Sequence, residues 1–228
     1  MNALRRVGAF LCLVSVAVFT GSCSSGGNHA QLRALQASPD ETTTLNVLVD
    51  GNTMFSNIAL GSPTNYTSVS SGSRHLQVEP SNSSIPAIDE MVTFNSSTNY
   101  TLITANFATS LTPILLTDNV TTPASGDFQI RLVNTAPSAG PIDIYVVAPG
   151  TAAGSVPATV SGLPFESSSS YQLLATGTYD VIFTQAGFAG VPYVQISSVA
   201  FGAGQNRTVV LTPNGNGGYA AVALNDLN

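Results

Sequence analysis

The chain has 228 residues, of which 43% are hydrophobic and only 8% are charged, and its formal net charge is −6. Its six basic residues are all arginines, so no lysine is present. A nucleic-acid-binding surface needs clustered cations to contact phosphates, so this composition argues against nucleic acid as a partner.

The first 22 residues predict a secretory signal peptide. Arg5 and Arg6 form a short basic start, Val7 to Phe19 is an uncharged and mostly apolar run, and small residues follow at 20–22. The apolar run is roughly 13 residues long, which is short of the ~20 needed to span a bilayer. We therefore expect residues 1–22 to be removed from the mature protein.

Cys23 determines the expected type of signal. Thr20-Gly21-Ser22-Cys23 resembles the lipobox of bacterial lipoproteins, although Thr20 stands where the family usually has Leu. The resemblance implies that Cys23 is lipidated and that residues 23–29 form a tether to the membrane. Ser24 in place of Asp resembles the signal for an outer membrane. The expected location is the bacterial cell envelope, with secretion after ordinary signal cleavage as the alternative.

The remainder of the chain is a duplication. Gln31-Leu32-Arg33 returns as Gln129-Ile130-Arg131, and Asn99-Tyr100-Thr101 returns as Asn206-Arg207-Thr208. A repeat this long predicts tandem domains rather than a solenoid. We expect a first β-sandwich repeat at residues 30–121 and a second at residues 125–228, separated by a short linker.

Within each repeat, apolar residues alternate with a period of two, as in a half-buried strand. Leu45, Val47 and Val49 show the pattern in the first copy, and Ile142, Ile144 and Val146 show it in the second. Asp50-Gly51 is a strong hairpin signal. Seven or eight such runs per copy predict an all-β fold, with two immunoglobulin-like or transthyretin-like sandwiches.

Both copies resemble a bacterial surface family known as domain of unknown function 4397. The first copy carries its pattern at Arg33, 37–40 and 49–51, and the second at Arg131, Pro137 and 142–146. Gln36 and Asn134 stand where the pattern has histidine, so any role of that histidine does not carry over. The resemblance implies a sandwich at the cell surface and no established activity.

The residues do not assemble a recognisable catalytic pattern. His75 is the one imidazole inside a predicted domain, Asp180 occupies its place in the second copy, and no Gly-x-Ser-x-Gly elbow is present. We expect no enzyme activity and no cofactor. The alternative is a carbohydrate-binding module or a hydrolase whose site lies in the longer loops of the second repeat, Pro149–Pro164, because loops carry function on sandwich scaffolds.

The acidic residues do not predict a metal site. Zinc needs three or four His, Cys or carboxylate ligands, and one domain histidine with no spare cysteine argues against such a site. Calcium needs oxygens only, and its candidates are Asp40-Glu41, Asp89-Glu90, Asp118 and Asp226, but isolated acids of this kind are usually solvated turn residues. We expect no bound metal.

Two residue pairs hold equivalent places in both copies and have two interpretations each. Arg33 and Arg131 are expected either to pair with a domain acid, Asp50 or Asp143, or to contact a ligand carboxylate. Tyr66 and Tyr171 are expected to pack at the core edge, with a sugar platform as the alternative.

The sequence thus predicts a lipid-anchored, non-enzymatic protein that serves as a binding or spacer module. The expected partners are the membrane, through the N-terminal lipid, and a surface glycan or an envelope protein.

Overall fold

The computed structural model describes residues 28–118 and 121–227 as an all-β protein, which confirms the predicted fold class. The strands of the first repeat are β1 (His29–Gln36), β2 (Leu45–Val49), β3 (Asn52–Ile58), β4 (Thr67–Ser70), β5 (Gly72–Pro80), β6 (Ile88–Phe94), β7 (Asn99–Ala105) and β8 (Thr112–Thr117), with one 3-10 turn at Ala108–Ser110. Within the described ranges, no helix is long and apolar enough to cross a membrane. The predicted signal peptide lies outside the described residues.

The second repeat has the same order of elements. Its strands are β9 (Asp127–Asn134), β10 (Ile142–Val147), β11 (Val160–Leu163), β12 (Ser167–Ser168), β13 (Gln172–Ala175), β14 (Gly177–Gln185), β15 (Phe188–Phe201), β16 (Asn206–Pro213) and β17 (Tyr219–Asp226). β12 and β13 both pair with β9, so together they occupy the place that β4 holds beside β1.

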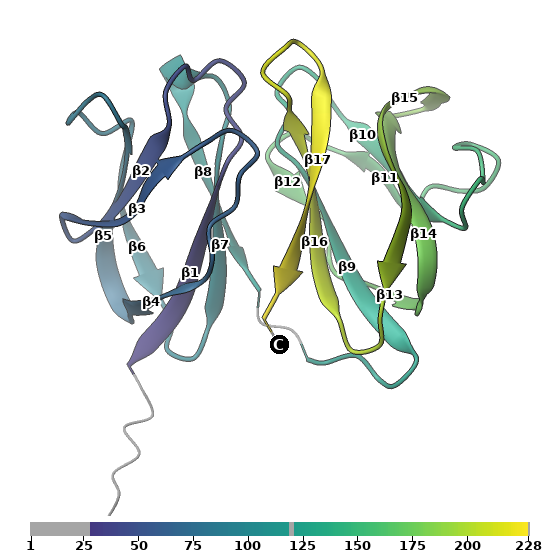
Figure 1. The fold of residues 1–228 in the computed structure, drawn as a ribbon, viewed down its shortest axis with the longest axis horizontal. Coiled ribbons are helices and arrows are strands. Elements are labelled where there is room, and N and C mark those ends of the chain that lie inside the picture. Colours follow the sequence, from purple (N-terminus) through teal and green to yellow (C-terminus); the bar gives the residue numbers. More distant parts are fainter. Residues whose placement is uncertain (1–27, 119–120, 228) are drawn as a thin grey trace, which may run out of the picture.

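Each repeat is a sandwich of two sheets with matching topology (Figure 1). The sheet orders are β4-β1-β7-β8 and β3-β2-β5-β6 in the first repeat, and β12-β9-β16-β17 and β11-β10-β14-β15 in the second. In both copies the first strand pairs in parallel with the last strand but one, β1 with β7 and β9 with β16. The strand pairs of the described residues all lie within one repeat or the other.

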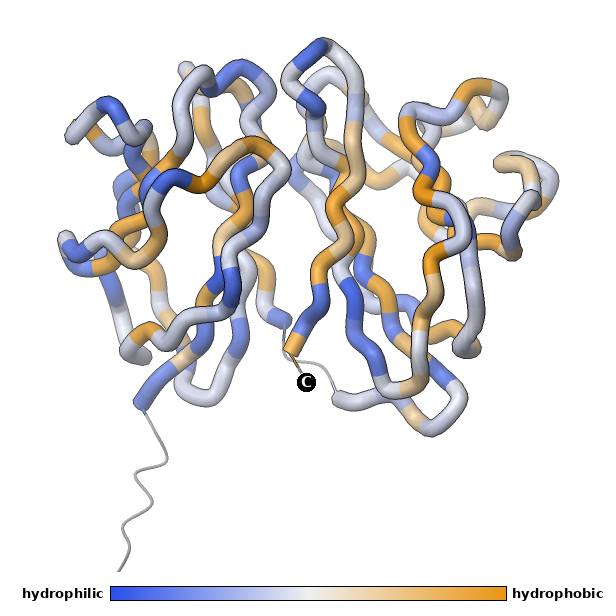
Figure 2. The backbone as a smooth tube through the Cα atoms, viewed as in Figure 1, coloured by the Kyte–Doolittle hydropathy of each residue, from blue (hydrophilic) through white to orange (hydrophobic). Residues whose placement is uncertain are grey.

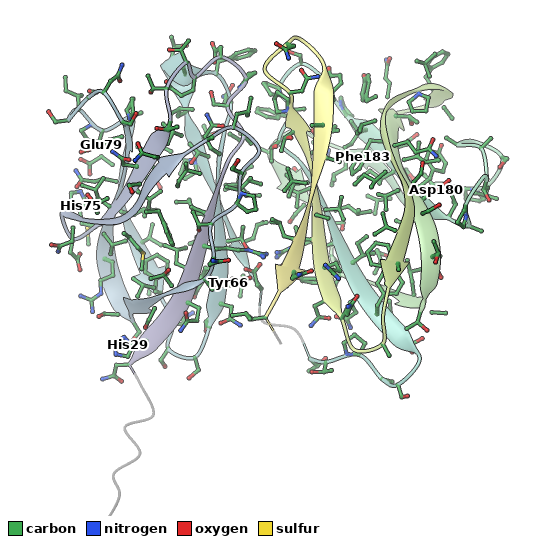
Figure 3. All side chains as sticks on the ribbon, in the orientation of Figure 1. His29, Tyr66, His75, Glu79, Asp180 and Phe183 are labelled. Carbon is green, nitrogen blue, oxygen red and sulfur yellow. The ribbon has the colours of Figure 1, made fainter. Side chains whose placement is uncertain are left out.

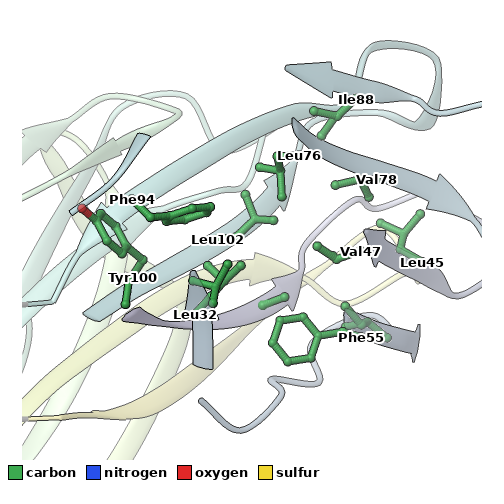
Figure 4. Packing of buried hydrophobic residues seen from close by; sticks show 14 of the residues in the cluster. Leu32, Leu45, Val47, Phe55, Leu76, Val78, Ile88, Phe94, Tyr100 and Leu102 are labelled. Atoms are coloured by element: carbon green, nitrogen blue, oxygen red, sulfur yellow. The ribbon is translucent and has the colours of Figure 1, made fainter. Parts of the chain in front are cut away.

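Alternating apolar residues form a separate core inside each sandwich. In the first repeat, Leu32, Leu76 and Leu102 are fully buried between the two sheets (Figure 4). Ile130, Phe183 and other apolar residues of the second repeat form the corresponding cluster. Burying each such side chain contributes about 1.5–3 kcal/mol, so each repeat has a substantial source of stability of its own.

The predicted hairpin at Asp50-Gly51 is confirmed. β2 ends at Val49, which pairs with Asn52 at the start of β3, so the turn has two residues. Asp50 has a φ of 52° and Gly51 a φ of 74°. Left-handed backbone at both positions is the type I′ geometry, whose twist matches that of the flanking strands.

The second repeat departs from simple alternation in β10. All six of its residues are buried, although the sequence pattern predicts one solvated face. The reason is a covering loop, residues 148–159, which lies on the outer face of this sheet and packs Ala153 and Ala158 near Tyr145. At Gly154 a Cβ would lie 2.7 Å from the Cβ of Ala189, so this close approach requires glycine.

A third apolar cluster joins the two sandwiches, which stand side by side in Figure 1 with their β1–β7 and β9–β16 sheets facing each other. Its buried members are Leu35, Ala37, Ile103 and Leu116 from the first repeat and Val133, Val210 and Leu224 from the second. Figure 2 shows hydrophobic segments on these middle strands. Leu35, Ile103 and Leu116 hold the same positions as Val133, Val210 and Leu224, so equivalent surfaces of the two copies meet.

Candidate functional site

Arg33 lies at the contact between the repeats and bonds across it. Its Nε donates to Thr101 Oγ1 at 2.8 Å, within the first repeat. Its two terminal nitrogens reach the second repeat, one donating to the carbonyl of Asn225 at 2.6 Å and the other to the carboxylate of Asp226. The guanidinium is thereby held by three partners on two domains.

Arg131 repeats this arrangement in the opposite direction. Its Nε donates to Thr208 Oγ1 at 3.1 Å within its own repeat, while its terminal nitrogens bind the carbonyl of Thr117 at 2.9 Å and the carboxylate of Asp118 in the first repeat. Each arginine is thus paired with the acid of the other copy.

The prediction that these arginines pair with Asp50 or Asp143 is wrong. Arg33 follows an inward-facing residue on β1, so it points out of its own sandwich and toward the second repeat, away from the sheet that carries Asp50. The Asp50 carboxylate instead accepts a hydrogen bond from the Arg74 guanidinium at 3.3 Å. Asp143 accepts the backbone N–H groups of Gly162 and Gly187, at 2.7 Å and 2.8 Å.

The two tyrosines complete the same network. Tyr66 donates its hydroxyl to Asp118 at 2.7 Å, and Tyr171 donates to Asp226 at 2.8 Å. Each ring also lies against the guanidinium of its own repeat, 4.5 Å from Arg33 and 4.8 Å from Arg131, at the distance of a cation–π contact. Burial, followed by the neighbouring carboxylate charge, raises the pKa of both phenols well above 10.0.

This network is structural. Arg33 is 3% exposed and Arg131 is 4% exposed, and the hydrogen bonds of both guanidinium groups are made to protein atoms. Asp118 and Asp226 are buried beside them and are held by charge-assisted hydrogen bonds. The geometry favours the first interpretation of the arginines, a buried pair with an acid, and assigns the tyrosines to packing at the contact between the repeats.

His75 and Asp180 hold equivalent positions but have different surroundings, on opposite outer sides of the molecule (Figure 3). His75 contacts the Asp89 carboxylate through Nε2 on a solvent-exposed strand face, and this hydrogen bond lowers the pKa of Asp89. Asp180 accepts the backbone N–H groups of Gly150 at 2.9 Å and Ser198 at 2.8 Å, which lower its pKa. Asp180 therefore fixes the start of the covering loop.

Most of the acids weighed for calcium, Asp40, Glu41, Asp89, Asp118 and Asp226, bind protein groups. Asp40 accepts the backbone N–H of Ala108 at 2.7 Å, and Glu41 accepts both the backbone N–H and the hydroxyl of Thr43. Across residues 28–118 and 121–227, no three His, Cys, Asp or Glu side chains converge as a metal site.

The first repeat contains an open groove of about 420 Å³, which is the candidate ligand site. It lies between the edge strands of the two sheets, β3 and β4, and Asp50 and Arg74 are among its lining residues. Thr53, Thr67 and Ser68 contribute polar side chains to its walls, and Met54 and Val69 contribute apolar surface. The groove thus combines hydroxyl groups, an ion pair and an apolar floor.

The two copies differ beside this groove, because arginine and tyrosine occupy opposite positions in them. At the position of Arg74 the second repeat has Tyr179, whose ring packs 5.6 Å from that of Phe128. At the position of Arg207 the first repeat has Tyr100, which packs edge-on against a core phenylalanine. Each sandwich therefore has a tyrosine ring at only one of these two positions. In the first repeat the ring is that of Tyr100, and the position beside the β3–β4 groove is held by Arg74.

The backbone contact at this position is the same in both copies, although the side chains differ. Arg74 Nε donates to the carbonyl of Ser70 at 3.0 Å, and the Tyr179 hydroxyl donates to the carbonyl of Ala175, the equivalent residue, at 2.7 Å. Arg74 also donates to the carbonyl of Ser71 at 2.6 Å. The arginine preserves the hydrogen bond while replacing a partly buried ring by a partly exposed charge.

The second repeat has a smaller hollow of about 220 Å³ beside Arg207. Its lining includes Asn206, whose amide is buried without a hydrogen-bond partner, and Asp226. Arg207 bonds to the Gln205 side chain at 3.2 Å. In both repeats a hollow thus lies where arginine replaces the aromatic ring.

Sequence reasoning missed both the groove and the contact between the repeats. An alignment of the two copies contains a signal for the groove. In it, Arg74 corresponds to Tyr179, and Tyr100 corresponds to Arg207. The predicted lipidation residue, Cys23, lies outside the described residues, so the site prediction made there stays a prediction.

Comparison with known proteins supports the family resemblance. A family model described as "Domain of unknown function (DUF4397)" matches residues 30–145. No match was found among curated proteins. Among solved structures, the crystal structure of CBMbc (family CBM26) from Eubacterium rectale Amy13K in complex with maltoheptaose is 13% identical, covers 88% of this chain and 98% of its own, and has a TM-score of 0.30. A TM-score this low carries no argument about function.

Proposed function

The chain belongs to the DUF4397 family, and from this premise we propose that it is a non-catalytic binding module held on the bacterial cell envelope by a lipid on Cys23. The observation that carries the proposal is the reciprocal pairing of Arg33 with Asp226 and of Arg131 with Asp118. Together with the apolar cluster between the repeats, it makes two sandwiches into one rigid body that can present a binding surface at a fixed orientation.

The surroundings of the reactive side chains support a binding role over catalysis. Asp180 is engaged by two backbone N–H groups, and His75 contacts Asp89 on an exposed strand face. Arg33 and Arg131 are buried in the contact between the repeats. Asp180 and the two arginines act within the fold, and the exposed His75 lines neither the groove nor the hollow described above, whereas a catalytic acid, base or nucleophile must face a bound substrate.

The position of β1 supports the anchoring role. β1 begins at His29, at the lower end of the first sandwich in Figure 1, and the hairpin between β16 and β17 is at the opposite end. A lipid on Cys23, six residues before His29, would hold the lower end near the membrane and direct the opposite loops outward. Two or three acyl chains are enough for lasting attachment.

Metabolic labelling with a palmitate analogue in a bacterium that processes lipoproteins tests the anchor. We expect label in the wild-type protein and in Cys12→Ser, and none in Cys23→Ser. Label in Cys23→Ser, or its absence from the wild type, would contradict the anchoring proposal.

A panel of ester and glycoside substrates tests the non-catalytic role against the alternative of a hydrolase in the second-repeat loops. We expect no turnover by the purified protein. Turnover that disappears in His75→Ala or Asp180→Ala would instead establish an enzyme and reject this part of the proposal.

A further inference from the structure

We propose that the groove beside Arg74 in the first repeat is a binding site for a neutral saccharide. The inference rests on the binding role proposed above and assigns that role a place and a class of ligand. At about 420 Å³ the groove falls within the ~300–1,000 Å³ of small-molecule sites.

The chemistry of the walls fits a polyhydroxylated ligand. A sugar hydroxyl both donates and accepts, so its site must offer both kinds of group. Arg74 supplies N–H donors, Asp50 supplies carboxylate acceptors, and Thr53, Thr67 and Ser68 supply hydroxyls that do either. The apolar floor can cover the C–H face of a sugar ring, which hydroxyl groups alone cannot do.

The charges in and around the groove favour a neutral ligand over an anionic one. Arg74 is already neutralised by Asp50, 3.3 Å away, so the groove carries no excess positive charge. Without Arg5 and Arg6 of the predicted signal peptide, the chain has four arginines against twelve acids, a net charge of −8 (4 − 12). This field repels anions, whereas a neutral saccharide is not affected.

The edge of β4 disfavours an extended peptide as the ligand. A peptide added to a sheet edge bonds to the free backbone groups of the edge strand. Arg74 occupies the carbonyl of Ser70, the last residue of β4, and that of Ser71 just beyond it. A charged side chain placed in this way protects an edge strand from further pairing.

The second repeat supplies the internal comparison. There Tyr179 takes the place of Arg74 and packs its ring against the core cluster, with Phe128 and Phe201 as neighbours. The same fold therefore accommodates an aromatic ring at this position, whereas the first repeat has an open groove with a partly exposed ion pair. Restoring the ring in the first repeat should close the site without disturbing the fold.

The test is binding of the full mature protein to an array of neutral and acidic oligosaccharides, with calorimetric titration of the strongest neutral glycan. We expect Arg74→Tyr, which copies the second repeat, and Asp50→Asn, which preserves the size of the groove, each to weaken binding at least ~10-fold. Arg207→Gln, in the hollow of the second repeat, is the matched control and should bind as the wild type does. Unchanged thermal unfolding of Asp50→Asn shows that the fold is intact.

The outcomes separate this inference from the binding role on which it rests. Neutral-glycan binding that persists undiminished in both Arg74→Tyr and Asp50→Asn would keep the binding role but overturn this groove as the site. Binding of acidic glycans alone would overturn the ligand class. If no oligosaccharide binds, the saccharide inference is rejected, while the palmitate and turnover experiments still decide the proposed function.

Discussion

Arg33 forms its buried ion pair with Asp226, which lies 193 residues further along the chain, in the other repeat. Arg131 and Asp118 form the equivalent pair in the opposite direction. The contact therefore has the property of a two-fold symmetric dimer, in which residue i contacts j and j contacts i, although here one chain supplies both halves.

Removing one acid of this network should destabilise the protein strongly. In Asp226→Ala the guanidinium of Arg33 remains buried, loses the carboxylate to which it is hydrogen-bonded and keeps only Asp118, 3.9 Å away. Removing one partner of a buried ion pair typically costs about 3–5 kcal/mol, so the free energy of unfolding in urea should fall by that amount.

Glu90→Ala is the control, because Glu90 is exposed, and its effect should stay within about 0.5 kcal/mol. The double variant Arg33→Met, Asp226→Leu should recover much of the loss, since replacing both ions by apolar groups is often neutral. A small effect of Asp226→Ala would mean that Arg33 does not depend on the second repeat.

The tyrosines of the network predict a loss of stability in alkali. Burial, followed by the carboxylates of Asp118 and Asp226, raises the folded-state pKa of Tyr66 and Tyr171 above the ordinary value of 10.0. Below pH 10 both states keep the phenolic protons, and above it only the unfolded chain releases them. The stabilisation is thus complete below about pH 10 and decreases as the pH rises further.

Urea unfolding from about pH 9 to about pH 12, with phenolate absorbance as a second signal, measures this dependence. We expect the decrease to be much smaller in the double variant Tyr66→Phe, Tyr171→Phe. An equal decrease in the wild type and the variant would show that other groups are responsible.

Separately produced repeats should fold and then self-associate. Residues 30–121 and 125–228 each contain two complete sheets and a core, but each half exposes its part of the apolar cluster between the repeats. The first repeat also contains both Arg33 and Asp118, so two copies can exchange the pairs that the two repeats exchange in the full chain.

Sedimentation of each half over a range of concentrations measures the association, and dispersed NMR spectra report folding. Ile103→Asp, which places a charge in the apolar face, should keep the first half monomeric. An undispersed spectrum would show that the halves do not fold alone, and a monomer at all concentrations would show that the face is not self-complementary.

The alternating runs around Leu45–Val49 and the Asp50-Gly51 turn could be predicted from the sequence because strand periodicity and turn geometry are local properties. The partner of Arg33 could not be predicted, because the choice between acids of the same and of the other repeat depends on how two finished sandwiches pack. The structure shows this packing in β7 and β16, where almost every residue is buried. Strands buried on both faces indicate cover on both sides of a sheet.

The groove was missed for a related reason. Considered by itself, Arg74 is a surface arginine. Its role beside the groove can be inferred only by comparison with Tyr179, the residue at the equivalent position of the other copy. The region 149–164 was predicted only as the longer loops of the second repeat, but two alanines of the covering loop pack on the outer face of β10. The groove and the contact between the covering loop and β10 both depend on side chains from several elements, so neither produces a periodic pattern in the sequence.

The most direct test of the reciprocal pairing is to cut the chain between the repeats and ask whether they stay together. A specific protease site inserted between Thr121 and Thr122 would allow complete cleavage of the folded protein. The two fragments should then elute as one particle at micromolar concentration, and the same cleavage in Asp226→Ala should release more of them as separate fragments. If the wild-type fragments separate fully after cleavage, the two repeats are independent domains on a linker, and the account of a rigid body held by Arg33–Asp226 and Arg131–Asp118 is wrong.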